Sequence, residues 1–187
     1  MQNEKEKPLS KVKQELAGII QHLNSTTACF TGHRSQKLPW RFNENDERCK
    51  AMKIRLRTEI ENAIQRGYNT FLCGMALGFD MMCAEMVLEL KNSYRDIKII
   101  GALPCRNQDA MWTAEYKQRY RALIKKLDGI RCIYEKYTGV ECMLERNRYM
   151  INNSSLVIAL FDGSNGGTKA TIEYAREQNM EIIVLQP

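Results

Sequence analysis

The feature that most restricts the fold of this sequence is the regular alternation of short apolar runs with longer amphipathic stretches. The clearest apolar run covers 155–161, and shorter ones cover 26–31 and 69–73. These runs are apolar rather than alternating, which is typical of strands in a parallel sheet covered on both faces. Separated by helical patterns, they predict βαβ units. We therefore predict an α/β fold, a three-layer, Rossmann-like, doubly wound and mainly parallel sheet.

The expected elements follow this alternation. Strands are expected at 26–31, 69–73, 97–103, 130–134, 155–161 and 181–185. Helices are expected at 45–66, 108–127 and 141–152, with two more ending near residues 90 and 178. The third strand is expected to stop at Pro104, because proline cannot donate to a sheet ladder. A separate helix at 10–23 predicts a helical appendage over 1–25, followed by one ligand-binding domain over 26–187.

Composition narrows the class of protein. No apolar run approaches the roughly 18 residues that a membrane span needs, so no membrane partner is expected. The polar start over 1–10 does not resemble a secretory signal, and we expect a cytoplasmic location. The seven cysteines form no C-x-x-C pair, and neither histidine is near one in sequence. Buried thiols in a reducing compartment are therefore expected, and no metal site.

The net charge of +6 is unevenly distributed. Between Arg95 and Arg131 there are nine Lys or Arg residues against four Asp or Glu residues. Such a segment fits a polyanion, but a solvated helix face explains it as well.

The loop after the fifth expected strand has the composition of an anion site. In an open α/β sheet, ligands bind outside the carboxyl ends of the strands. Asp162 is followed by Gly163, Gly166 and Gly167, and Thr168 opens the next helix. Glycines expose main-chain N–H groups, the helix start adds partial positive charge, and the threonine hydroxyl can donate to a phosphate. The alternative is a tight turn with Thr168 as the N-cap.

The first expected strand ends in Thr31-Gly32-His33-Arg34. The arginine suits a phosphate or carboxylate through paired hydrogen bonds. The histidine can act as an acid or base near neutral pH. Alternatively, the histidine bonds a backbone carbonyl and the arginine forms a surface ion pair.

The second expected strand leads into Gly74, Met75, Gly78 and Asp80. This is neither a G-x-G-x-x-G fingerprint nor a P-loop. Asp80 can bond ribose hydroxyls or cap the following helix. We count all four with the ligand-binding residues, although methionine here is also typical of a core.

Aromatic and basic residues elsewhere are weaker candidates. Trp40 and Trp112 can stack a base, but a core or rim role is more usual. Arg146 and Arg148 are two residues apart, so at most one faces the site.

Three segments carry a resemblance to a known family. The runs 29–40 (CFTGHRSQKLPW), 74–80 (GMALGFD) and 162–169 (DGSNGGTK) resemble the YpsA-like branch of the SLOG superfamily. The resemblance extends over about 26–187. It implies a Rossmann-like sheet with a pocket for nucleotide-derived ligands, such as ADP-ribose or NAD.

Two related families frame the alternatives. Lonely-Guy phosphoribohydrolases carry a Met-x-x-Arg-Lys helix and a G-G-x-G-T-x-x-E loop. Met143, Arg146 and Thr168 match, and the resemblance places Arg146 in the site, but Asn147 stands where the lysine is expected. The catalytic glutamate is missing, and the nearest acid, Glu173, is expected to point away. This departure argues against hydrolysis.

The DNA-processing protein A family binds single-stranded DNA through a related fold. The run 74–80 is similar to its glycine-rich turn, and the basic segment 95–131 fits a phosphate backbone. Tyr116 and Tyr120 can stack bases, but they fall on the apolar stripe of their helix, which points them inward.

The leading hypothesis is a binding module or sensor for a nucleotide-derived small molecule. A nucleotide N-glycosidase is the second hypothesis, with His33, Asp80 and Glu173 as its candidate catalytic residues. A single-stranded nucleic-acid binder is the third. A homo-oligomer is compatible with each of them.

Overall fold

One six-stranded sheet organises the protein. The computed structural model describes residues 9–187. The strands are β1 (Thr27–Gly32), β2 (Thr70–Cys73), β3 (Lys98–Cys105), β4 (Gly129–Tyr134), β5 (Leu156–Leu160) and β6 (Glu181–Leu185). Every neighbouring pair is parallel, and the order is β4-β3-β2-β1-β5-β6. The predicted parallel sheet is confirmed.

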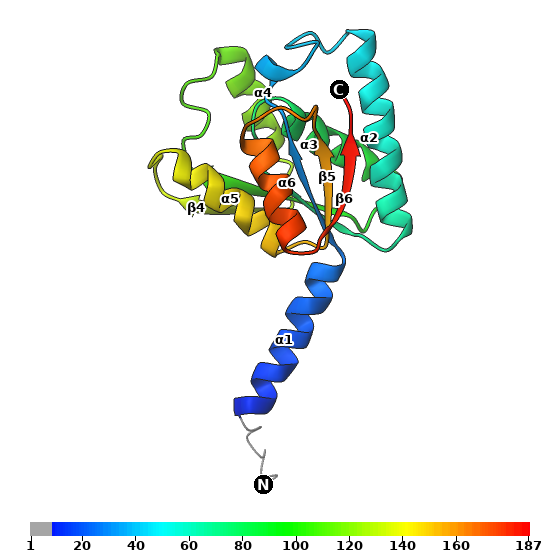
Figure 1. Cartoon of the computed structure of the whole chain (residues 1–187), viewed down its shortest axis with the longest axis vertical. Coiled ribbons are helices and arrows are strands. Elements are labelled where there is room, and N and C mark those ends of the chain that lie inside the picture. The colour runs from blue at the N-terminus through cyan, green and yellow to red at the C-terminus, as the bar shows by residue number, and fades with distance from the viewer. Residues whose placement is uncertain (1–8) are drawn as a thin grey trace.

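Helices cover both faces of the sheet. They are α1 (Leu9–Ser25), α2 (Glu47–Gln65), α3 (Phe79–Leu90), α4 (Ala114–Ile124), α5 (Val140–Asn152) and α6 (Gly167–Glu177), with a short 3-10 turn η1 (Ser35–Lys37). Figure 1 shows α5 and α6 in front of the sheet, α3 and α4 behind it, and α2 beside β6. Helix α2 packs into the same apolar cluster as α3. The three-layer architecture is therefore confirmed.

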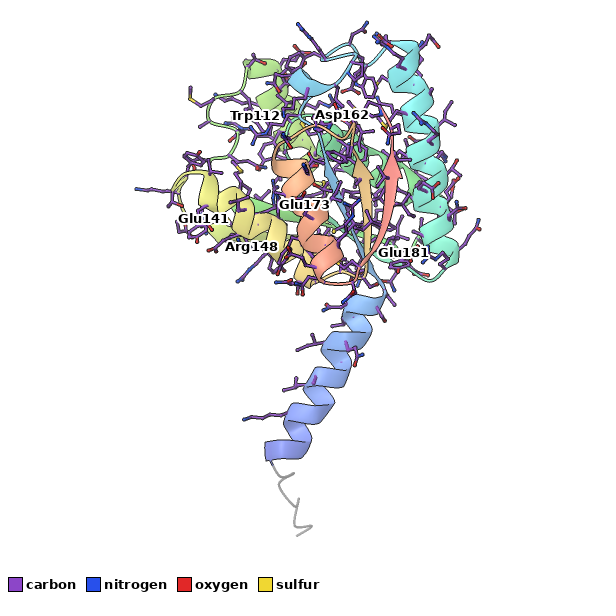
Figure 2. All side chains as sticks on the ribbon, in the orientation of Figure 1. Trp112, Glu141, Arg148, Asp162, Glu173 and Glu181 are labelled. Atoms are coloured by element: carbon purple, nitrogen blue, oxygen red, sulfur yellow. The ribbon has the colours of Figure 1, made fainter. Side chains whose placement is uncertain are left out.

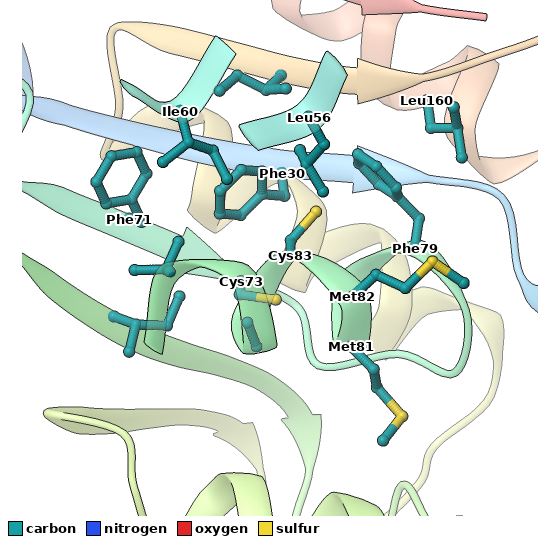
Figure 3. Packing of buried hydrophobic residues seen from close by; sticks show 14 of the residues in the cluster. Phe30, Leu56, Ile60, Phe71, Cys73, Phe79, Met81, Met82, Cys83 and Leu160 are labelled. Atoms are coloured by element: carbon teal, nitrogen blue, oxygen red, sulfur yellow. The ribbon is translucent and has the colours of Figure 1, made fainter. Parts of the chain in front are cut away.

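Each face of the sheet buries its own apolar cluster. Behind it, Phe30 and Phe71 from neighbouring strands stack with ring centroids 5.8 Å apart. They pack in one cluster with Leu56 and Ile60 of α2 (Figure 3). A smaller cluster joins β5 to α5 and α6. Because both faces are covered, the central strands are apolar along their length.

Two boundaries differ from the sequence prediction. β3 does not stop at Pro104 but continues to Cys105, which pairs with Tyr134 of β4. Pairing with β2 ends at Gly101, so β3 has a free side beyond it, and proline is tolerated where no ladder bond is required. The helix expected from residue 108 begins only at Ala114, because turns occupy most of 106–113.

The strand order locates the opening where a ligand is expected. From β1 the chain adds β2, β3 and β4 on one side, and then β5 and β6 on the other. The reversal lies between β1 and β5, so the connections leaving these two strands pass to opposite faces. Ligands in doubly wound sheets bind at this position.

Helix α1 extends away from the domain, as Figure 1 shows. Its Leu16, Ile19, Ile20 and Leu23 are exposed. Asn24 Nδ2 donates to the carbonyl of Asn152 at 3.2 Å, where the helix meets the domain. None of the helices in residues 9–187 combines the length and apolar character that a membrane crossing requires.

We predict that a variant lacking residues 1–24 keeps its folded domain. The deletion removes the exposed Asn24 bond and a hydrogen bond from Thr27 to the Leu23 carbonyl. Each is worth about 1 kcal/mol, so we expect a fall in Tm of at most roughly 8 °C. Thermal unfolding followed by circular dichroism measures it. A much larger fall would show that 1–24 is part of the domain.

Candidate functional site

A cavity of about 370 Å³ opens at the reversal between β1 and β5. Its walls come from five segments: the end of β1, the η1 turn, the start of α3, one face of α5 and the start of α6. Its lining residues are Phe30, Thr31, Gly32, His33, Arg34, Gln36, Lys37, Ala76, Asp80, Met143, Arg146, Asn147, Met150, Gly166, Gly167 and Thr168. The glycine loop and the first crossover therefore face the same space.

Three cationic side chains line this cavity. Arg34 and Lys37 come from the first crossover, and Arg146 comes from α5. Lys37 Nζ donates to the carbonyl of Asn165 at 2.9 Å, so the first crossover reaches across to the glycine loop. Among the described residues that line the cavity, Asp80 is the one acid. The balance of charge suits an anion.

The start of α6 adds main-chain donors to the cationic side chains. The N-cap of α6 is Gly166, and no side chain caps the helix. Thr168 is therefore not the N-cap, which removes the alternative of a simple capped turn. The first N–H groups of a helix lack partners within the helix, and here they begin at the cavity wall.

His33 is held by a carboxylate beside the cavity. Asp162 Oδ1 lies 2.8 Å from His33 Nε2, and Thr168 Oγ1 lies 3.5 Å from His33 Nδ1. Hydrogen bonds from Ser164, with a smaller effect of His33, lower the pKa of Asp162 to about 2. An ionised carboxylate only accepts, so His33 carries a proton on Nε2. In the neutral ring, Nδ1 then accepts from the Thr168 hydroxyl.

Arg146 is buried, with 5% of the residue exposed, at the floor of the cavity. Its Nη1 donates to the carbonyl of Gly74, and to that of Ala102 at 3.4 Å. Its Nε donates to Asn147 Oδ1 at 2.8 Å. Burial lowers the pKa of Arg146, and Asp80 opposes this shift. A Cβ atom at position 74 would overlap the guanidinium, which explains the glycine there.

Asp80 faces the same cavity from the first turn of α3. Burial raises the pKa of its carboxyl group, while Arg146 and the N–H of Ala76 oppose the rise. Asp80 Oδ2 accepts from that N–H at 3.2 Å. The N-cap of α3 is Gly78, so Asp80 does not cap the helix. Gly78 has φ of 111°, and a Cβ there would lie 2.6 Å from the N atom of Ser35.

The structure brings together nine of the predicted ligand-binding residues. They are Thr31, Gly32, His33, Arg34, Asp80, Arg146, Gly166, Gly167 and Thr168. Gly74, Met75, Gly78, Asp162 and Gly163 do not line the cavity. Met75 is fully buried in the core, Gly74 and Gly78 shape the turn, and Asp162 supports His33.

Four further candidates lie elsewhere. Glu173 lines a separate groove between α5 and α6, part-way along α6 and away from Asp162 (Figure 2). Arg148 is exposed and pairs with Glu141. Trp112 packs edge-on against Tyr120, and Trp40 is buried in the core. None of these candidates lines the cavity.

Sequence reasoning missed several residues of the site. Lys37 follows Arg34 by three residues in the first crossover, and that basic spacing could have identified it. Asn147 adjoins Arg146 but had been noted only as a departure from a lysine. Met143, Met150 and Phe30 give the cavity an apolar wall, and their sequence positions carry no signal of this.

The surface of α4 carries a further groove. Three basic residues at four-residue steps line this groove: Lys117, Arg121 and Lys125. None of its described lining residues is acidic. Within residues 9–187, no group of three or more His, Cys, Asp or Glu residues is arranged to hold a metal ion.

Comparison with known proteins gives consistent matches. The sequence model of YpsA, the YspA SLOG family, matches residues 28–186. The SPbeta prophage-derived protein YoqJ of Bacillus subtilis is 33% identical over 138 residues, covering 67% of this chain and 81% of YoqJ. A UPF0398 protein of Brevibacillus brevis is 28% identical over 128 residues, covering 68% of each chain.

Two solved structures share the fold. DNA processing protein A from Helicobacter pylori, described for its single-stranded DNA binding mode, superposes with a TM-score of 0.60 at 20% identity. The match covers 89% of this chain and 67% of that one. The Streptococcus pneumoniae protein gives 0.58 at 16% identity, and the chain spans 50% of its length. At these identities the likeness establishes the fold.

We predict that Asp80→Asn stabilises the protein at pH 7. The carboxyl pKa is raised above its ordinary 3.8, so ionised Asp80 disfavours folding above the raised pKa. The gain in Tm should shrink as the pH falls towards 3.8, because wild-type Asp80 then takes up its proton. Thermal unfolding across this pH range measures it.

Asp162→Asn is the matched control, and its effect on stability at pH 7 should be opposite to that of Asp80→Asn. The lowered pKa of Asp162 stabilises the fold above pH 3.8, and this contribution is lost as the pH falls towards 2. The control should therefore be less stable than wild type at pH 7. If both substitutions changed the Tm at pH 7 in the same direction, the opposite pKa shifts of Asp80 and Asp162 would be contradicted.

Proposed function

The chain belongs to the YspA branch of the SLOG family, and we propose that it is a binding module or sensor for a nucleotide-derived ligand such as ADP-ribose or NAD. The observation that carries the proposal is the convergence of Arg34, Lys37 and Arg146 with the start of α6 on one cavity. Guanidinium groups and helix N-termini are the usual protein partners of phosphate.

The rest of the cavity suits the remainder of a nucleotide. Asp80 offers an acceptor for ribose hydroxyls, and Phe30, Met143 and Met150 offer apolar contact. At about 370 Å³ the cavity is near the lower end of the roughly 300–1,000 Å³ typical of ligand sites. We infer that it encloses a phosphate and its sugar, and that the far end of a dinucleotide lies outside.

We predict that ADP-ribose or NAD raises the Tm of the protein and that Gly167→Glu abolishes this rise. A ligand at 100 times its Kd stabilises the folded state by about 2.7 kcal/mol. A carboxylate at position 167 would occupy the anion site, while a negative charge in the first turn of a helix favours folding. Thermal shift across a nucleotide panel measures both effects.

Ala170→Glu is the matched control for this experiment. Residue 170 adds the same charge to α6 but faces the groove between α5 and α6. The control should keep the ligand-induced rise. A flat response of the wild-type protein to every nucleotide and sugar nucleotide would overturn the proposal.

Nucleotide N-glycosidase activity is a second candidate, favoured by the position of Asp80. This buried carboxyl group with a raised pKa lines the cavity, as a general acid or base must. Glu173 is outside the cavity and cannot take this role. On this candidate the wild type releases base from a nucleoside monophosphate, and Asp80→Asn slows release by about 10²–10⁴-fold. Absence of release with retained binding would leave the sensor alone.

Single-stranded nucleic acid is a less favoured ligand. The basic groove on α4 fits a phosphate backbone. However, the tyrosines expected to stack bases are already occupied: Tyr120 is buried and bonds Gln108, and the Tyr116 ring lies 5.4 Å from that of Phe42. An oligonucleotide in the same thermal-shift panel separates this candidate from a small-molecule ligand.

A further inference from the structure

Asn147 joins the guanidinium in the cavity to the start of α6. Its Oδ1 accepts from Arg146 Nε at 2.8 Å, and its Nδ2 donates to Thr171 Oγ1 at 2.8 Å. Thr171 Oγ1 in turn donates to the carbonyl of Gly167 at 2.8 Å. Three hydrogen bonds therefore run without a gap from α5 to the first residue of α6.

The direction of each bond in this chain is fixed by chemistry. Arginine has no acceptor, so the oxygen of the Asn147 amide must face Arg146. The amide nitrogen then faces Thr171, whose own hydrogen is left for the Gly167 carbonyl. A carboxamide supplies an acceptor and a donor at opposite ends without adding charge. An aspartate here would lose the donor and partly neutralise the guanidinium.

The surroundings of Arg146 leave its charge available to the cavity. Its hydrogen-bond partners are the carbonyls of Gly74 and Ala102 and the amide of Asn147, all of them neutral. These bonds use Nε and Nη1, while the residue still lines the cavity. The guanidinium is therefore held by neutral hydrogen-bond acceptors and not by a salt bridge, although Asp80 is near enough to oppose the lowering of its pKa by burial.

We propose that Asn147 is a positioning residue that sets the spacing between the Arg146 guanidinium and the first turn of α6, and thereby the affinity for an anion bound between them. The inference rests on the proposed function, because it assumes that both elements contact one anionic group. Asn147 acts through Arg146 and Thr171, and the ligand's phosphate contacts the elements that Asn147 holds.

Thr171→Val removes the hydroxyl from this series of hydrogen bonds without changing a residue that lines the cavity. Thr171→Ser keeps the hydroxyl. Thr171 is buried and does not line the cavity. With ADP-ribose as the titrated probe, we expect Thr171→Val to weaken binding about tenfold, the order of one hydrogen bond to a charged network. Thr171→Ser should restore wild-type affinity. Asn147→Asp should weaken binding further, because it also reduces the positive charge. Equal affinity of wild type and Thr171→Val would overturn the inference.

A readout without ligand separates this inference from the proposed function. Hydrogen exchange of the Arg146 Nε proton, followed by ¹⁵N NMR, reports whether Asn147 still holds the guanidinium. We expect slow exchange in wild type and Thr171→Ser, and faster exchange in Thr171→Val at unchanged backbone protection. Equal exchange in all three proteins sinks the inference even if the wild type binds ADP-ribose. Faster exchange in Thr171→Val, together with a wild type that binds no nucleotide, sinks the proposed function while the positioning role stands.

Discussion

A buried guanidinium must be surrounded by acceptors, and this requirement organises the centre of the protein. Arg146 reaches from α5 to two main-chain carbonyls, that of Gly74 directly after β2 and that of Ala102 within the neighbouring β3. Removing a cation from water without such partners would cost several kcal/mol. The glycine at position 74, the turn that follows β2 and the inward face of α5 are therefore linked by one charged side chain. The cavity forms where this charge meets the reversal of the strand order.

The sequence predicted the scaffold well because its signal is local. Apolar runs and three- to four-residue periodicity record burial on each face, so the strands and the three layers followed from them. The errors arose where tertiary pairing decides the outcome. Pro104 remains in β3 because β2 has already ended beside it, and the residues before Ala114 form turns although their pattern suits a helix. Neither circumstance is visible in the segment itself.

The site was predictable at its glycine-rich ends and less so along its walls. Gly166, Gly167 and Arg34 were identified because glycine before a helix and arginine in a loop are residue types that bind anions. Met75 was misplaced because its neighbours in sequence are functional, whereas its side chain packs in the core. Lys37 and Asn147 were overlooked because their roles depend on segments more than twenty residues away: Lys37 bonds the carbonyl of Asn165, and Asn147 bonds Thr171. Such partners are set by the fold.

The distribution of polar groups within the cavity limits what it can recognise. Cations and the start of α6 provide donors for an anion, whereas Asp80 provides an acceptor in the same space. An ionised Asp80 repels a bare phosphate, so inorganic phosphate alone uses only part of the site. A ligand that carries hydroxyl donors beside its phosphate satisfies both sets, and its apolar surface meets Met143 and Met150. Under the proposed function, a phosphorylated sugar is therefore a better ligand than a simple anion, since only the former matches donors with acceptors across the whole cavity.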